Sequence, residues 1–526
     1  MPSSKAANPV PLMHASPAST MPCPVLPIRR SWPLHDTAAS RAAEQRAALT
    51  LPPHTLMARA GHATARLALA IAPHALRVDI CCGPGNNGGD GLVAAVDLKR
   101  LGRDVRLWHL GASDRLPDDA ADALRKAREA GLTVHTGPPE RLDADLVIDA
   151  LLGLGGRGIE SGPLAQAASA MLASGRTVLA IDLPSGLDGD TGRVPGGLAV
   201  RAEHSLSLLS LKPGLFTGSG RELAGQVWFD DLGAAPADDS ATALLVGPDR
   251  VQWLLPRRRH DQHKGSFGNV VVLGGATGMV GAAWLAARGA LGSGAGRVWV
   301  APLGGGSGFD PTRPELMWRS SASVLQHAVL MDSTVVCGCG GGDAVREPLP
   351  TVLHHAARLV LDADALNAVA AEPALASALR ARAQRGLPTV LTPHPLEAAR
   401  LLGCSVTDVQ ADRLQSAGRL AAQLACVVVL KGSGTVVATP TGLPLINASG
   451  NARLATAGTG DVLAGWIGGH WSQIGQGEPS AVDAATASVH LHGWAADRSP
   501  TQGPLLAADL VDAMVDAADT LRAAAR

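Results

Sequence analysis

The fold is decided by Val78-Asp-Ile-Cys-Cys-Gly-Pro-Gly-Asn-Asn-Gly-Gly-Asp-Gly91, in which an apolar run passes into five glycines. Residues 78–82 predict a buried strand, and the residues after Gly91 predict a helix. Glycines let a backbone approach a ligand or take positive φ, and a helix N-terminus offers free N–H groups to a phosphate. The spacing is not G-x-G-x-x-G. A plain tight turn would not need two asparagines and an aspartate, so the segment indicates a ligand-binding loop.

The pattern around this segment repeats along the chain. Short apolar runs alternate with Ala-, Leu- and Arg-rich helical stretches, which predicts βαβ units and mostly parallel sheets. The strands expected in a first set are 78–82, 105–109, 146–150 and 177–182. Those of a second set are 270–274, 297–301, 335–337, 359–362, 389–392 and 427–431. The fold class is therefore α/β, with two domains.

The polar, small-residue stretch 233–242 is the expected linker between a domain of residues 31–232 and one of residues 243–526. Few contacts are expected to cross it, so each half should fold alone. Residues 1–30 are rich in Pro, Ser and Ala without periodicity, and we expect them to be disordered.

Composition excludes several classes of protein. The net charge of −1 gives no global field for nucleic acid or anionic membranes, and no apolar run is long enough to span a bilayer. Seven cysteines without a C-x-x-C pair indicate a reducing compartment. We therefore expect a cytoplasmic protein with small-molecule ligands, no nucleic-acid or membrane partner, and a homo-oligomeric state.

Carboxylates end two apolar strands of the first domain. Asp149 ends Leu-Val-Ile-Asp, and Asp182 ends Leu-Ala-Ile-Asp with Ser185 close behind. Singly, such residues are often caps or turn formers. With the segment Asn86–Asp90 after residues 78–82, three neighbouring strand ends carry oxygen ligands. Together they could instead hold a mono- or divalent cation or place a proton-transfer base beside a substrate. Lys212, in Leu-Lys-Pro-Gly, is a weaker candidate that could equally be a solvated turn residue.

The second domain carries its own signals at strand ends. His394 lies between two prolines that hold it rigidly, and Lys431 ends a strand where it suits a phosphate charge. The strongest signal is Gly458-Thr-Gly-Asp461 before a helical run. Its N–H groups could stabilise a phosphate charge, and Asp461 could accept a proton from an attacking hydroxyl. The alternative is that Asp461 only caps the helix.

Three motifs of the first domain together resemble the NAD(P)HX epimerases: Asn86-Asn-Gly-Gly-Asp-Gly91, Ile148-Asp-Ala-Leu-Leu-Gly153 and Ile181-Asp-Leu-Pro-Ser-Gly186. The resemblance implies a Rossmann-like αβα sandwich that interconverts the R and S forms of hydrated NAD(P)H. It implies Asp182 as the proton-transfer residue, and a potassium ion held by Asn87, Asp149 and Ser185. The substrate-lining residues that it implies are Asn86, Asn87, Gly88, Gly89, Asp90, Gly153, Leu154, Gly155, Gly156, Arg157, Gly158, Ile159 and Asp182.

Motifs of the second domain together resemble the ADP-dependent NAD(P)HX dehydratases of ribokinase-like fold: His263-Lys-Gly, Asp362-Ala-Asp-Ala-Leu366, Thr392-Pro-His-Pro, Lys431-Gly-Ser-Gly-Thr and Ala457-Gly-Thr-Gly-Asp. The resemblance implies ADP as co-substrate with magnesium, and Asp461 as the catalytic residue. It implies substrate contacts from Ala282, Gly340, His394 and Asp461, and nucleotide contacts from Lys431, Gly432, Ser433, Gly434, Thr435 and Gly460. Two departures are Leu396, where the family usually has Gly, and Cys337-Gly-Cys-Gly340, where it usually has Gly-Pro-Gly.

Three functions follow as hypotheses. The first is a bifunctional repair enzyme that epimerises NAD(P)HX and dehydrates the S form with ADP, releasing AMP and phosphate. The second is a small-molecule kinase with an accessory nucleotide-binding domain, which Gly-Thr-Gly-Asp alone permits but the Thr-Pro-His-Pro turn disfavours. The third is a first domain that only binds, which the presence of Asp149, Asp182 and Ser185 disfavours.

Overall fold

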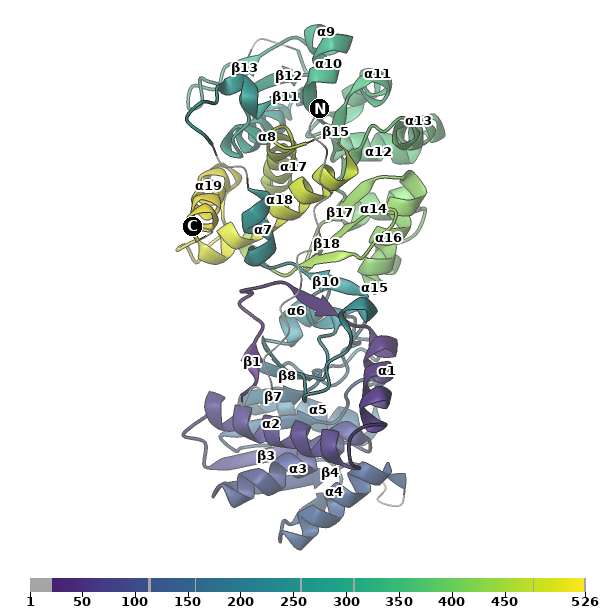
Figure 1. Ribbon diagram of the computed structural model, residues 1–526, viewed down its shortest axis with the longest axis vertical. Helices are drawn as coiled ribbons and strands as arrows, with labels where there is room; N and C mark the ends of the chain where they lie inside the picture. The colour runs from purple at the N-terminus through teal and green to yellow at the C-terminus, as the bar shows by residue number, and fades with distance from the viewer. Residues whose placement is uncertain are drawn as a thin grey trace.

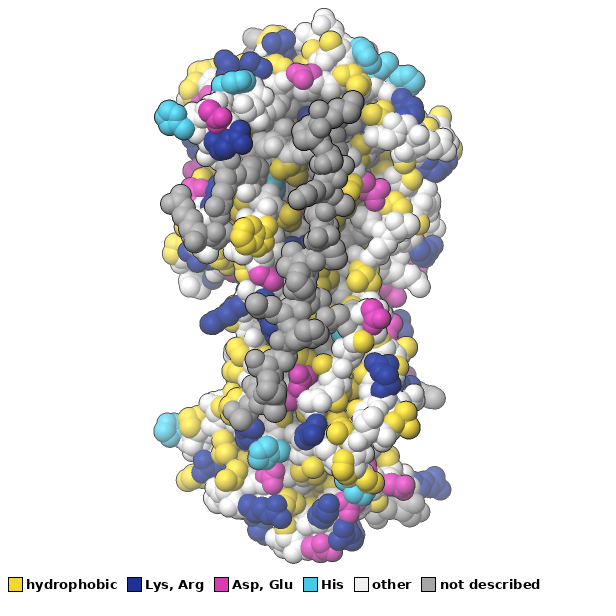
Figure 2. All heavy atoms as spheres, viewed as in Figure 1, with side chains coloured by type: hydrophobic (Ala, Val, Ile, Leu, Met, Phe, Trp, Pro, Cys, Tyr) yellow, Lys and Arg dark blue, Asp and Glu magenta, His cyan; other side chains and the backbone are white. Residues whose placement is uncertain are grey.

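The computed structural model describes residues 21–111, 115–156, 158–255, 258–305, 308–475 and 477–524. The molecule is elongated, with two lobes stacked along its long axis, and β10 and α6 lie where they meet (Figure 1). The first lobe is built on an eight-stranded sheet and the second on an eleven-stranded sheet, so the predicted two-domain α/β architecture is confirmed. On the face in Figure 2, basic and acidic side chains are interspersed over both lobes.

The first sheet has the strand order β1-β9-β8-β7-β6-β3-β4-β5, and every pair is parallel except β1 with β9. Its strands are β1 (Cys23–Pro24), β3 (Arg77–Cys82), β4 (Asp104–His109), β5 (Val134–Thr136), β6 (Leu146–Ala150), β7 (Thr177–Ile181), β8 (His204–Leu208) and β9 (Gln226–Asp230). The helices of this part of the chain are α1 (Thr37–Ala48), α2 (Thr55–Ile71), α3 (Asn86–Arg100), α4 (Asp118–Glu129), α5 (Gly162–Ser174) and the short α6 (Gly220–Leu223).

The second sheet has the order β13-β12-β11-β14-β15-β16-β17-β18-β19-β10-β2, parallel as far as β17 and mixed beyond it. Its strands are β2 (Trp32–Leu34), β10 (Ala243–Leu245), β11 (Asn269–Gly274), β12 (Arg297–Pro302), β13 (Met317–Trp318), β14 (Ser333–Cys337), β15 (Arg358–Leu361), β16 (Thr389–Leu391), β17 (Val427–Leu430), β18 (Thr435–Ala438) and β19 (Leu445–Asn447). Its helices are α7 (Pro248–Leu254), α8 (Val280–Gly292), α9 (Ser321–Val324), α10 (His327–Asp332), α11 (Leu349–His355), α12 (Asp364–Ala371), α13 (Pro373–Gln384), α14 (Pro395–Leu402), α15 (Val406–Ala411), α16 (Arg413–Leu424), α17 (Thr459–Trp471), α18 (Glu478–Arg498) and α19 (Ala507–Ala524).

The glycine-rich segment after β3 differs from the predicted loop, because α3 already begins at Asn86. None of its five glycines, between residues 83 and 91, has positive φ. They are needed for close packing: a Cβ on Gly88 would lie 2.1 Å from the carbonyl oxygen of Gly83, and one on Gly91 would lie 2.6 Å from the Ala150 Cβ. The segment is therefore a strand end followed directly by the first turn of a helix pressed onto the sheet.

The expectation of disorder over residues 1–30 is wrong for residues 21–30, and residues 1–20 lie outside the described part of the chain. The strand β1 pairs with β9, and Val25 is fully buried. The next strand, β2, belongs to the other sheet and pairs antiparallel with β10, Leu34 opposite Ala243. Apolar side chains anchor the segment despite its proline-rich composition, because they find a core to enter.

The expectation of few contacts between the halves is also wrong. A hydrophobic cluster continues across the junction and takes side chains from both domains. Its buried members are Val25, Trp32, Leu34, Leu183, Leu187, Leu211, Leu215, Phe216, Ala224, Val227, Ala243, Leu245, Ile446 and Ala448. Apolar burial of this kind is the main favourable term in association, so the domains form a tight pair. Among the described helices, none is long and apolar enough to cross a membrane.

Candidate active sites

The first site lies at the carboxyl ends of β6 and β7, which are adjacent and parallel. Asp182 follows β7 directly and has φ of 66°, a left-handed conformation that a non-glycine residue adopts at a cost. The ammonium group of Lys212 forms an ion pair with Asp182 and also donates to the Leu208 carbonyl at 2.7 Å. Lys212 is fully buried, so the alternative of a solvated turn lysine is wrong.

Asp149 and Ser185 form a second buried cluster beside this pair. The Ser185 hydroxyl donates to Asp149 Oδ1 at 2.6 Å, and the Ser185 backbone N–H donates to Oδ2 at 2.8 Å. Burial raises the pKa of Asp149 to about 6, although the Ser185 and Leu151 hydrogen bonds oppose this. No Lys or Arg in the described part of the chain forms an ion pair with Asp149, so a buried carboxylate stands without a countercharge.

Asn87 and Gly153 complete the entrance to Asp182. A Cβ on Gly153 would lie 3.0 Å from Asn87 Oδ1 and 3.2 Å from Asp182 Oδ2, so only glycine leaves the space between them open. The backbone N–H of Leu154 donates to Asp182 Oδ2 at 3.1 Å. The Asn87 Nδ2 is buried and has no hydrogen-bond partner among the described residues. Four of the predicted residues therefore converge on one point.

The remaining predicted residues of this site differ in their surroundings. Burial, then the charges of Asp182 and Glu44, raise the pKa of Asp90 well above its usual range. Asp90 therefore lies close enough to these two carboxyls to interact with them. A Cβ on Gly89 would meet the Met57 side chain, and Ile159 lies in a hydrophobic cluster, so these two contribute packing. Asn86 begins α3, and Gly155, Gly156 and Gly158 continue the loop after β6. Arg157 lies outside the described residues.

Sequence reasoning missed the contribution of α1 to the first site. Burial, then Asp182, raise the pKa of Glu44, which places this carboxyl near the site. A Cβ on Gly155 would lie 2.3 Å from Arg41 Nη2, so the guanidinium rests against the loop backbone. No signal within α1 could have found them, since an Arg and a Glu on an alanine-rich helix are typical of a solvated face.

The second site lies at the carboxyl ends of β15 and β17 and the N-terminus of α17. Lys431 Nζ lies 2.8 Å from Asp362 Oδ1, and a Cβ on Gly460 would lie 3.3 Å from the same nitrogen. The Cys339 sulfur and carboxylate oxygens of Asp362 and Asp461 lie within 4.8 Å of one another. The site thus combines one ammonium, two carboxylates and a thiol.

Asp461 is not the cap of α17. The cap is Gly458, with φ of 91° and no side chain to offer, and Asp461 lies in the first turn. Burial, then the charge of Asp362, raise the pKa of Asp461 to about 6, while a hydrogen bond with Cys339 and the charge of Lys431 oppose the rise. Asp461 therefore does not cap the helix, and its carboxyl lies beside Asp362, Lys431 and Cys339.

The other residues predicted to contact substrate lie around this cluster. A Cβ on Gly340 would lie 2.8 Å from the Ala282 Cβ, so these two are in contact. His394 caps α14 through Nδ1, which accepts from the backbone N–H of Leu396 at 3.1 Å, while Nε2 lies 3.2 Å from Glu397. This cap holds the ring in place and leaves about half of the side chain exposed.

The predicted nucleotide loop, residues 431–435, has the positive φ angles that the first glycine-rich segment lacks. Gly432 has φ of 131° and Gly434 has φ of 65°. Asp362, Cys339 and Glu397 are the residues of this site to which the sequence analysis assigned no role. Asp362 carries the signal used for Asp149, an Asp at the end of an apolar strand, so the same rule could have found it.

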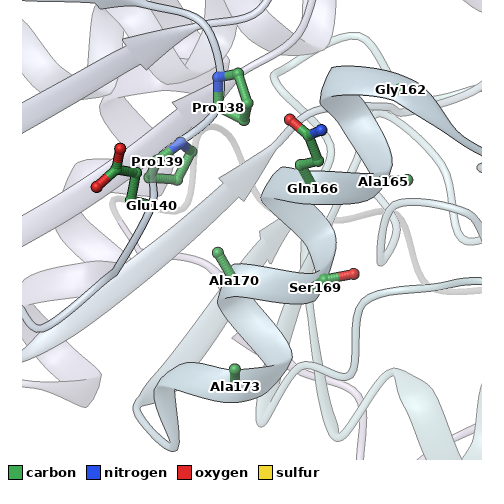
Figure 3. A pocket seen from close by; sticks show the side chains of 9 residues that line it. All are labelled: Pro138, Pro139, Glu140, Gly162, Ala165, Gln166, Ser169, Ala170 and Ala173. Carbon is green, nitrogen blue, oxygen red and sulfur yellow. The ribbon is translucent and has the colours of Figure 1, made fainter.

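Two open grooves of the described surface lie away from both sites. One of about 570 Å³ runs between the loop after β5 and the outer face of α5 (Figure 3). Its lining residues are Pro138, Pro139, Glu140, Gly162, Ala165, Gln166, Ser169, Ala170 and Ala173. None of them is a predicted site residue.

Two parallel sheets with carboxylates, a lysine and glycine-rich turns at their strand ends define a two-domain α/β enzyme. Comparison with known proteins agrees with this class. The family model described as NAD(P)H-hydrate dehydratase matches residues 270–515, and the one described as YjeF-related protein N-terminus matches residues 53–214.

The chain is 38% identical over 489 residues to a bifunctional NAD(P)H-hydrate repair enzyme of Escherichia coli, which covers 89% of this chain and 91% of the relative. It is 37% identical to the bifunctional NAD(P)H-hydrate repair enzyme of Coxiella burnetii, and the match covers 87% of this chain and 93% of that relative. The chain belongs to the bifunctional NAD(P)H-hydrate repair enzymes. A solved ADP/ATP-dependent NAD(P)H-hydrate dehydratase from Bacillus subtilis, 31% identical, covers 52% of this chain and 97% of its own, with a TM-score of 0.43.

Proposed function

We propose that the first domain interconverts R- and S-NAD(P)HX and that the second dehydrates S-NAD(P)HX with ADP, yielding NAD(P)H, AMP and phosphate. The observation that carries the proposal is Asp461: a half-buried carboxyl with a pKa raised to about 6, in the first turn of a helix capped by Gly458 and close to Lys431.

In the second domain, Asp461 takes the proton of the substrate hydroxyl as its oxygen attacks the β-phosphorus of ADP. The new O–P bond forms while the P–O bond to AMP breaks and AMP leaves with the electron pair. Lys431 and the N–H groups at the start of α17 stabilise the charge on the transferred group. The ring then expels phosphate, a better leaving group than hydroxide, and loses a proton to restore the reduced nicotinamide. Ala282, Gly340 and His394 line the space for the ring.

In the first domain, Asp182 is the proton-transfer residue at the hydrated ring. Its position at a strand end, its left-handed backbone and its Lys212 partner fix the carboxylate toward Asn87 and Gly153. Lys212 donates to three groups, Asp182, Leu208 and Ser207, so it orients Asp182. The open space at Gly153 is where the substrate approaches the carboxylate.

A potassium ion in the first domain fits the residues present. Asp149, Ser185 and Asn87 offer the oxygen ligands that hard cations take, and Asp149 is a buried carboxylate without a countercharge in the described part of the chain. The ion would supply that charge and hold the loop after β6 beside the substrate. In the second domain, Asp362 would offer a carboxylate oxygen to the magnesium that accompanies ADP, since Asp461 serves as the base, whereas the Cys339 sulfur is a poor ligand for it.

The test is recovery of absorbance at the reduced-nicotinamide band by the full-length protein with mixed epimers of NADHX and either ADP or ATP. We expect complete recovery with ADP and one phosphate released for each NADH. Recovery that stalls after the S form is spent would remove the epimerase function. Accumulation of a stable phosphorylated product without phosphate release would favour the small-molecule kinase instead.

A further inference from the structure

A short segment of the first domain reaches from one site to the other. It starts at Lys212, the partner of Asp182, and continues through a 3-10 turn, Pro213–Leu215, to Thr217 and Gly218. Gly218 N–H donates to the Ser433 carbonyl at 3.2 Å, and the Ser433 hydroxyl donates back to the Gly218 carbonyl at 3.1 Å. The Thr217 hydroxyl donates to the Gly434 carbonyl at 3.2 Å. The first domain thus touches the nucleotide loop of the second directly.

Arg413, the first residue of α16, lies beneath the same loop. Its Nη2 donates to the carbonyls of Leu430 and Lys431, each at 3.1 Å, and its Nε donates to the Thr217 hydroxyl at 3.2 Å. The side chain is about 1% exposed, and burial lowers its pKa to about 10. No carboxylate in the described ranges forms an ion pair with it. A buried guanidinium that binds only neutral acceptors costs stability, so its contacts with the loop call for a functional reason.

The direction of these bonds supplies that reason. Three peptide groups of the loop turn their carbonyls to the domain junction: those of Lys431, Ser433 and Gly434. In a planar trans peptide the N–H of the next residue points the opposite way. The N–H groups of Gly432, Gly434 and Thr435 are therefore directed away from the junction, as in the backbone nests that bind phosphates.

A second contact at the junction acts on the other loop of the site. Arg221 Nη2 donates to the Gly450 carbonyl at 3.3 Å. Asp497 accepts from the Gly450 N–H at 2.7 Å and from Asn451 Nδ2 at 2.8 Å. Residues 450–451 precede Gly458-Thr-Gly-Asp461 in the chain. The first domain therefore contacts residues 433–434 of the nucleotide loop and, through Arg221, the segment that leads to the second glycine-rich loop.

We propose that Thr217 is a positioning residue of the nucleotide site: with Arg413 it holds the carbonyls of residues 431–435 so that their N–H groups face the phosphates of ADP. The first domain is then part of the ADP site of the second, although it contributes no atom that touches the nucleotide. This inference rests on the proposed function, which assigns residues 431–435 to ADP.

The test uses the full-length protein with Thr217→Val, which keeps the shape of the side chain and removes the hydroxyl. It leaves the Arg413 Nε without its partner and the Gly434 carbonyl with only the long contact from Arg413 Nη2 at 3.5 Å, and we expect the KM for ADP to rise about 5- to 20-fold. The kcat at saturating ADP, the KM for S-NADHX and the epimerase rate should stay as in the wild type. Thr217→Ser should restore the KM for ADP, and Arg413→Lys, which cannot fork to two carbonyls, should raise it further.

The matched control is Thr242→Val at the same junction. Its hydroxyl accepts from the Asp36 N–H at 3.0 Å and does not touch the nucleotide loop. We expect it to lower Tm without changing the KM for ADP. If Thr217→Val leaves the KM for ADP unchanged, or changes both Michaelis constants together as a general loosening would, the positioning role is refuted while the proposed function stands. If the wild type neither binds nor uses ADP, both the positioning role of Thr217 and the proposed function are refuted.

Discussion

Each site holds one Asp–Lys ion pair and one aspartate without such a pair. The candidate catalytic aspartate belongs to the ion pair in the first site, but it is the unpaired aspartate in the second. In the first site the candidate, Asp182, is the paired one, and Asp149 stands alone. In the second site Asp362 takes Lys431, and the candidate Asp461 stands alone. Burial raises the pKa of both unpaired carboxyls to about 6.

The difference teaches that a strand ending in Asp does not define a role by itself. An unpaired buried carboxylate is unstable as an anion and therefore takes up either a proton or a cation. Where a hydroxyl has to be deprotonated, as we propose at Asp461, that property makes a base. Where potassium is available, as we propose at Asp149, the same property makes a cation site. The position of the lysine decides which aspartate is left for which task.

The largest expected effect comes from Asp461→Asn, which keeps the shape and removes the base. Dehydration should fall by about 10²- to 10⁴-fold, while ADP binding in calorimetry and the epimerase rate stay near those of the wild type. Unchanged dehydration would show that Asp461 is not the proton acceptor. Loss of ADP binding as well would show that its role is to hold the nucleotide.

A second prediction compares the two lysines by stability. Lys212→Met leaves Asp182 alone in a fully buried position, which costs about 3–5 kcal/mol. Lys431→Met should cost less, because the Lys431 side chain is 20% exposed and water can replace it. Thermal unfolding of both variants, with the surface variant Lys99→Met as control, measures the difference. Equal losses for Lys212→Met and Lys431→Met would mean that burial does not distinguish the two pairs.

The pH dependence of dehydration sharpens the comparison further. Asp461 must be deprotonated to accept the proton, and its pKa is raised to about 6. The rate at saturating substrates should therefore be constant above about pH 7 and fall tenfold per pH unit well below 6. Cys339→Ala removes a hydrogen bond that favours the carboxylate, so the falling limb should move to higher pH. A shift to lower pH would contradict the described contact.

The smallest expected effect concerns potassium and Asp149. Its folded pKa, about 6, lies above the unfolded value of 3.8, so the neutral form stabilises the fold at low pH and that stability is lost as pH rises through 6. Potassium binds the ionised form and should restore the loss. We expect potassium to raise Tm by about 2 °C at pH 7.5 relative to a bulky organic cation, and not at pH 5. Asp149→Asn should abolish the difference.

Sequence reasoning predicted the central strands of both sheets, because buried parallel strands are short, apolar and followed by helices. It predicted the ends of these strands as the sites for the same reason, and Asp149, Asp182, Lys431 and Asp461 lie there. It missed β8, β10 and the edge strand β2: β8 carries polar side chains, whereas β2 and β10 are short and pair with residues distant in sequence.

The two glycine-rich motifs show a limit of another kind. The glycines of residues 83–91 were expected to approach a ligand or take positive φ, but none of them has positive φ, whereas Gly432 and Gly434 in the expected nucleotide loop do. Whether a glycine serves backbone conformation or close packing depends on what lies against it, such as Gly83 against Gly88, and no local pattern carries that information. The ion pair of Lys212 was likewise unpredictable, because its partner is 30 residues away in the chain.

The position of β2 has a consequence for the order in which the protein forms. Residues 32–34 leave the ribosome early, whereas the strand they pair with, residues 243–245, is synthesised roughly 200 residues later. At about 5–20 residues per second, about 10–40 s pass between the two events. During that interval the first domain can complete its own sheet, but its leading strand has no neighbour to bind. The second sheet therefore takes its outermost strand, β2, from a segment that precedes the first domain in the chain, and this strand can pair only after residues 243–245 have been made.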